Sequence, residues 1–186
     1  MDRFVKRYIA KDEAEIGDAV YFEHTGDSSN IFVGESYFLA TKTLLQEIEN
    51  IGSYGSVLLN AVFFNFRHYL EFSMKNIIEN YGGHFGEAVS VRNHQLMPLY
   101  QSVENIATGS GGKTKDLIVL KECCEFFNHF DPNSFSFRYD KDKKGEKIFS
   151  ELHNKWLSSR KILEDLNSCS IILRGMPGFI DHKFGF

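Results

Sequence analysis

Cysteine, net positive charge and long apolar runs are all scarce in this sequence, and each shortage excludes a class of protein. Three Cys, two of them adjacent at Cys123 and Cys124, are too few for a disulfide framework and indicate a reducing compartment. The formal net charge of -4 gives no overall attraction for nucleic acid, so any contact with RNA or DNA would have to be local. No apolar run reaches the roughly 18 residues needed to cross a bilayer, and the chain opens on a charged segment rather than a signal peptide. We therefore expect a cytoplasmic protein without a membrane partner.

Apolar and aromatic residues are plentiful. The 186 residues are 42% hydrophobic, with 18 Phe and 8 Tyr, which is enough for one sizeable core and leaves aromatic side chains for a groove or an interface. No linker divides the chain, so we predict a single domain over residues 1–186, with 1–32 as an irregular N-terminal segment packed on it.

Apolar residues recur mostly at helical spacing along the sequence. This spacing predicts helices over 33–50, 57–81, 94–106, 115–129 and 149–173, with Asn93 as an N-cap for the third. In the second helix the apolar residues recur at helical spacing, and the last helix is expected to place Trp156 on its core face and to end at 175–178. Alternating aromatics predict a short extended segment near 135–140. The fold class predicted is therefore all-α, an up-and-down bundle of five or six helices.

A row of charged residues follows the apolar stripe of the second helix. Arg67, Glu71 and Lys75 stand at successive i, i+4 positions and so project from one flank. One interpretation is a solvated ladder of ion pairs, and the other is a polar cluster that closes against the neighbouring helix, which begins near His94.

The same region resembles a known family. The segments Asn65–Lys75 and His94–Tyr100 are similar to the helix pair of HEPN (higher eukaryotes and prokaryotes nucleotide-binding) proteins, in which an Arg–x–x–x–Glu–x–x–x–Lys helix precedes one that opens with His–x–Leu–x–x–Leu. The segment Phe137–Asp140 and the final Leu-rich helix resemble later parts of such proteins, so the likeness spans about residues 35–176.

The resemblance implies recognition of RNA or a nucleotide, in settings such as antiviral defence, abortive infection or toxin–antitoxin modules, and a homodimer. If the chain has a polar site, its expected placement on facing helices favours the set Arg67, Glu71, Lys75, His94 and Arg138. In this hypothesis Arg67 and Arg138 contact phosphate, His94 gives or takes a proton, and Glu71 orients Arg67 or Lys75. The family's ribonuclease motif, an Arg followed after roughly four to six residues by a His, is absent from this sequence. Cleavage of RNA would therefore need an unusual pairing across helices, such as Arg67 with His94.

A second hypothesis belongs to a different class. The surplus of Phe, the negative charge and the missing motif favour a non-catalytic interaction or dimerisation module, whose polar cluster is structural and whose aromatic surface binds a partner protein or a second copy.

Two other motifs favour ordinary structural interpretations. Residues 107–114 match a relaxed phosphate-loop pattern, but the segment before them is predicted to be a helix rather than a buried strand, which favours an interhelical loop. Cys123, Cys124, His129 and His153 lack the spacing of a zinc site and are more typical of buried thiols and surface histidines. We expect no metal and no cofactor.

Overall fold

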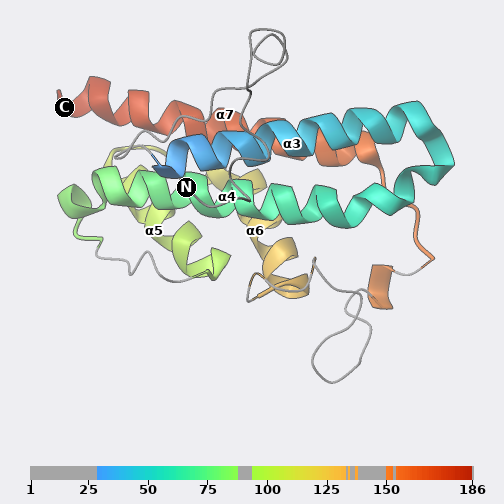
Figure 1. The fold of residues 1–186 in the computed structure, drawn as a ribbon. Coiled ribbons are helices and arrows are strands. Elements are labelled where there is room, and N and C mark those ends of the chain that lie inside the picture. Colours follow the sequence, from blue (N-terminus) through green and yellow to red (C-terminus); the bar gives the residue numbers. More distant parts are fainter. Residues whose placement is uncertain are drawn as a thin grey trace, which may run out of the picture.

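The computed structural model describes residues 29–87, 94–132, 134, 137, 150–152 and 154–185. Within them lie five α-helices and no β-strand, so the predicted all-α class is confirmed. The long helices run up and down along a common direction, and two shorter ones pack across them (Figure 1). None of the described helices is both long enough and apolar enough to span a membrane.

The central helix is α4 (Leu59–Tyr81). It packs against α3 (Ser29–Ile51), α5 (Leu96–Gly109), α6 (Ile118–Phe130) and α7 (Ser159–Phe184). Its predicted apolar stripe is buried throughout, which confirms that prediction: the five residues are Val62, Phe66, Leu70, Met74 and Ile77. Because neighbours cover α4 on several sides, even polar residues of this helix lie inside the protein.

A tight hairpin joins α3 to α4. The two helices lie side by side along most of their length (Figure 1), and a Cβ added at Gly34 would come 3.2 Å from Ser73 Oγ, so glycine permits the close approach. The connection is a 3-10 helix, η2 (Gly52–Leu58), which begins at a left-handed glycine with φ of +60°. Helical structure thus also occupies the gap between the predicted helices 33–50 and 57–81.

The last helix differs from its prediction at both ends. Ser158 caps its N-terminus by accepting a hydrogen bond from the Lys161 amide, and the helix continues through Pro177 to Phe184. The Gly–Met–Pro–Gly segment does not end it because Met176 and Ile180 remain buried on its core face. Trp156 precedes the helix and is 97% exposed, so its predicted core position is wrong.

Smaller differences concern the other boundaries. Residues 29–32 of the predicted irregular segment belong to α3, and α5 begins at Leu96 with Gln95 as its N-cap, whereas the predicted cap Asn93 lies outside the described residues. Of the predicted extended segment at 135–140 only Phe137 is described, and it has 3-10 geometry and packs its ring against Phe63.

Candidate functional site

The charged row of α4 is inside the protein. Arg67 Nη1 donates a hydrogen bond of 2.8 Å to Glu71 Oε2, and Lys75 Nζ donates one of 2.8 Å to Glu71 Oε1. The exposed fractions of the three side chains are 0%, 1% and 7% in chain order. Of the two interpretations of this row, the structure therefore supports the cluster that closes against neighbouring elements.

Arg67 connects three elements. Its Nη2 donates to the backbone oxygen of His94 at 2.6 Å, just before α5 begins. Its Nε donates to the backbone oxygen of Asp131 at 3.2 Å and forms an ion pair of 3.4 Å with Asp131 Oδ2, at the end of α6. Each guanidinium nitrogen thus has an acceptor within the protein. We call Arg67, Glu71, Lys75, His94 and Asp131 the polar cluster.

His94 is the exposed member of the polar cluster. Its side chain is 62% exposed, and Nδ1 lies 2.8 Å from Glu71 Oε1. Because a carboxylate only accepts hydrogen bonds, this contact places a proton on Nδ1 and leaves the lone pair of the neutral ring on Nε2. No described residue forms a hydrogen bond with Nε2.

The electrostatics of the cluster are balanced around Glu71. Burial acts to raise the pKa of this carboxyl, but hydrogen bonds from Lys75, Arg67 and His94 outweigh the burial and lower the pKa below its ordinary value. Glu71 therefore stays ionised, and the two basic and two acidic side chains of the cluster's interior offset one another.

His68, beside Arg67 in the sequence, occupies a different environment. Its ring packs against Tyr37 and Phe64, Nδ1 donates to the Phe64 carbonyl at 2.7 Å, and Nε2 lies 3.1 Å from Ser134 Oγ. Burial lowers the pKa of His68, so the neutral ring is favoured. Neither His68 nor Asp131 was predicted from the sequence as a site residue. The aromatic residues at helical spacing around His68 are a signal in the sequence for its environment. The Asp131–Pro132 pair is typical only of a turn and does not indicate a buried ion pair.

The remaining sequence candidates have separate outcomes. Arg138 lies outside the described residues, so its phosphate contact stays a prediction. In the glycine-rich loop, the amides of Ser110, Gly111 and Gly112 donate to carbonyl oxygens of α5 and thereby close that helix. Those N–H groups are then not available to cradle a phosphate, which agrees with the predicted interhelical loop.

The cysteines are packing residues of the core. Cys123 and Cys124 of α6 and Cys169 of α7 are buried free thiols, and a hydrogen bond with Cys123 together with burial raises the pKa of Cys169. His129 contacts Glu151 at 3.2 Å instead of a thiol, and His153 is outside the described residues. No group of three or more metal-ligating side chains occurs in the part of the chain that the structure describes.

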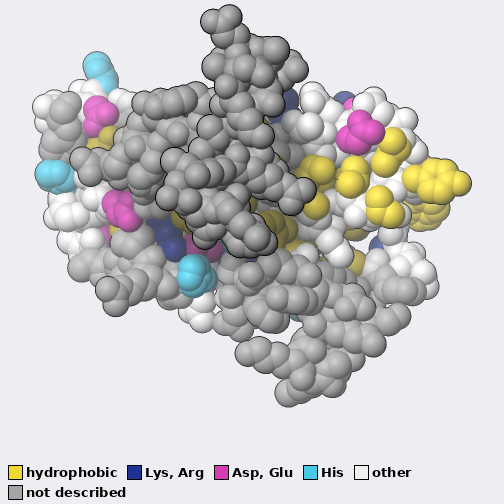
Figure 2. All heavy atoms as spheres, viewed as in Figure 1, with side chains coloured by type: hydrophobic (Ala, Val, Ile, Leu, Met, Phe, Trp, Pro, Cys, Tyr) yellow, Lys and Arg dark blue, Asp and Glu magenta, His cyan; other side chains and the backbone are white. Residues whose placement is uncertain are grey.

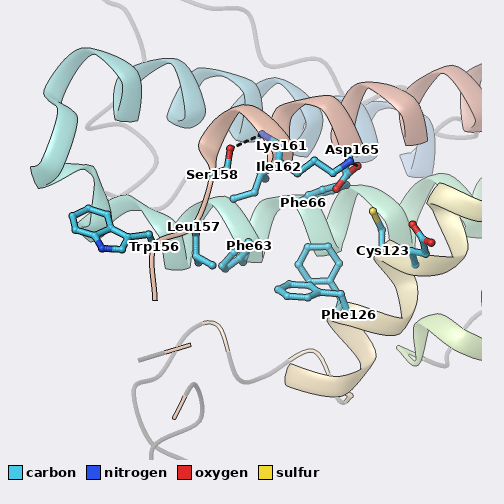
Figure 3. Close-up of a pocket in the computed structure, with 12 residues that line it drawn as sticks. Phe63, Phe66, Cys123, Phe126, Trp156, Leu157, Ser158, Lys161, Ile162 and Asp165 are labelled. Carbon is cyan, nitrogen blue, oxygen red and sulfur yellow. Dashed lines mark hydrogen bonds and ion pairs between the residues drawn. The ribbon is translucent and has the colours of Figure 1, made fainter. Parts of the chain in front are cut away.

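An apolar groove of about 290 Å³ lies between α4, α6 and the start of α7 (Figure 3). Its walls are aromatic and aliphatic: Phe63, Phe66, Phe126, Phe127, Leu157 and Ile162. Trp156 stands at one end of the groove with its ring directed away from Phe63. Lys161 and Asp165, at the rim, form a 2.8 Å ion pair with each other.

Further apolar side chains are exposed where α3 turns into α4. Tyr54 is 80% exposed, Val57 76% and Ile51 37%. Figure 2 shows hydrophobic side chains gathered at this end of the molecule.

Comparisons of the chain with protein-family models, with curated proteins and with solved structures find no match.

Proposed function

We propose that this chain is a non-catalytic helical interaction module, in which the polar cluster braces the bundle and the exposed apolar surface binds a partner protein or a second copy. The observation that carries the proposal is the state of Arg67. Its side chain has no exposed surface, and all three guanidinium nitrogens are bonded within the protein. A phosphate would have to displace these bonds and open the core to reach it, which argues for a positioning role.

The apolar surface supports the same proposal. Exposed large apolar residues are common when they are scattered, but a contiguous patch marks an interaction site. Here Trp156 is almost fully exposed beside an aromatic groove, and Tyr54 and Val57 are exposed at the same end. Aromatic residues of this kind are the typical anchors of protein interfaces.

The experiment pairs light scattering over a range of protein concentrations with an RNA-binding titration at low and high salt. Association without RNA affinity supports the interaction module. RNA binding that collapses as salt rises, together with a monomeric protein, contradicts it, because such a salt dependence reports contacts with phosphate.

A second candidate function, recognition of RNA or a nucleotide by a HEPN-like bundle, is favoured by one specific observation. The Glu71 carboxylate contacts Nδ1 of the exposed His94 ring and leaves Nε2 without a hydrogen bond to a described residue, which suits a histidine that accepts a proton. If the wild type cleaves or binds RNA and His94→Gln does not, the result would support this candidate. The matched control is His129→Gln, since His129 is also about half exposed and also contacts a glutamate. Equal behaviour of the two variants would count against the candidate.

A further inference from the structure

We infer that the apolar end of the bundle, defined as Ile51, Tyr54, Val57 and Trp156 with the hollows beside them, is a self-complementary surface that binds the same surface of a second copy of this chain. This inference rests on the proposed function and deepens it by naming the surface and the partner.

The shape of the surface is the first argument. Trp156 lines the apolar groove on one side, and on the other it lines a second hollow of about 460 Å³. That hollow is bounded by η2 through Gly52, Gly55 and Ser56 and by the segment before α7. A bulky exposed ring thus borders two hollows. In a two-fold pairing each surface meets its own copy, so the ring of one copy can enter a hollow of the other and the reverse contact follows by symmetry.

The charge distribution allows a second copy as the partner. The chain carries a net charge of -4, so two copies repel each other through most of their surfaces. The stretch from Asn50 to Phe66, which includes all of η2, contains no Asp, Glu, Lys or Arg. This uncharged stretch can face its own copy without placing like charges together, and the charged residues that line the hollows besides the rim pair, Glu122 and Lys155, carry opposite signs. The rim pair Lys161–Asp165 is already satisfied internally.

The area is sufficient for association. A buried aromatic side chain contributes roughly 150–250 Å². With the fractions exposed here, Trp156, Tyr54, Val57 and Ile51 together offer on the order of 500 Å² of apolar surface per copy. A stable interface buries roughly 800 Å² per partner, so the four side chains supply more than half and the walls of the hollows supply the remainder.

Trp156 is also the probe for the test, because it is the chain's one tryptophan. Fluorescence of the whole protein is followed over a dilution series, in parallel with light scattering. We expect the mass of a dimer at high concentration, with Trp156 emission moving to shorter wavelength and becoming less accessible to a neutral quencher as the dimer forms.

Two matched substitutions locate the surface. Val57 and Ile171 are 76% and 75% exposed, and both belong to helical segments. Val57→Glu is expected to weaken association by roughly 100-fold, since it places a carboxylate opposite its own copy, whereas Ile171→Glu changes it by about twofold or less. Trp156→Ala is expected to weaken association by about 30-fold or more. Circular dichroism checks that each variant retains its helices.

The outcomes separate this inference from the proposed function. A protein that stays monomeric at every concentration overturns the inference, as does a dimer in which Trp156 stays open to the quencher. A dimer broken by Ile171→Glu but not by Val57→Glu also overturns it, yet leaves the interaction module standing with its surface elsewhere. If the protein does not associate and binds RNA in a way that depends on His94, the result contradicts both this inference and the proposed function.

Discussion

In this molecule charged side chains lie inside, at the middle of α4, while large apolar side chains lie outside, on η2 and on the segment before α7. Arg67 and Glu71 are 0% and 1% exposed, whereas Trp156 and Tyr54 are 97% and 80% exposed. Hydrophobicity alone predicts the reverse placement of both groups.

These opposite placements indicate which region stabilises the fold. Buried charges are tolerated only when each is paired and hydrogen-bonded, and then the removal of one partner leaves the other uncompensated. Exposed apolar side chains are already in water, so their removal costs the folded state little. The polar cluster should therefore dominate stability, and the apolar end should dominate association.

The largest expected effect is that of Arg67→Met. The substitution keeps a long side chain but leaves Glu71 and Asp131 without the guanidinium that they face. We expect it to lower the free energy of unfolding by about 3–5 kcal/mol, measured by urea denaturation. The matched control is Arg160→Met, which breaks an i, i+4 pair with Glu164 in which Arg160 is 86% exposed. That change should cost about 0.5 kcal/mol or less.

The double variant Arg67→Met with Glu71→Met separates pairing from packing. If the cluster acts through its paired charges, removing both partners costs less than the sum of the two single changes. Costs that simply add would show that the two side chains act independently, and the contrast between the two regions would lose its basis.

Acid should weaken the polar cluster selectively. The pKa of Glu71 lies below its ordinary value of 4.5 in the folded protein. A carboxyl with a depressed folded pKa stabilises the protein fully above its unfolded pKa, and that stabilisation is lost as pH falls through the folded pKa. We expect urea unfolding of the wild type to show a steeper loss of stability below about pH 4.5 than unfolding of Glu71→Gln. If the free energy of unfolding depends on pH in the same way in both proteins, the ionised Glu71 does not stabilise the fold.

The sequence was sufficient to predict part of the polar cluster. Spacing alone placed Arg67, Glu71 and Lys75 in one row, because helical geometry is local. His94 entered only through one of the two interpretations of that row and through the family resemblance. The sequence was not sufficient to predict their burial, which depends on the start of α5 and the end of α6 converging on α4. Asp131 entered the cluster through that convergence, and no local pattern encodes it.

The apolar end was harder to predict, for a related reason. Leu152, Trp156 and Leu163 lie at spacings close to those of a helix, so a helix from 149 explained them all. In the structure the helix begins only at Ser159, after the Ser158 cap. Because Trp156 lies before the helix, helical geometry does not direct its side chain to the core. The indole ring is therefore exposed on the surface.

A moderate effect is expected from Gly55→Ala, which tests how the apolar end is held. A Cβ at this position would lie 2.7 Å from Ile48 Cγ2 and 3.1 Å from Ile48 Cα, so η2 would have to move away from α3. We expect a loss of about 1–3 kcal/mol in the free energy of unfolding, measured by urea denaturation. Gly83→Ala is the control, because Gly83 also lies in a 3-10 helix but has open space around an added Cβ. Equal losses in the two variants would show that packing against Ile48 does not fix η2.

The smallest expected effect on folding is that of Trp156→Ala. Removing the largest side chain of a protein normally costs several kcal/mol when it is buried, but at 97% exposure the ring has almost no contacts to lose. Measured at a concentration where the chain is monomeric, the free energy of unfolding should change by about 0.5 kcal/mol or less. A large loss at that concentration would mean that the ring supports the fold, and the division between an interior that stabilises and an end that associates would fail. A small loss of folding stability would show that the exposed indole does not support the fold. That result would favour a role for Trp156 in an interface.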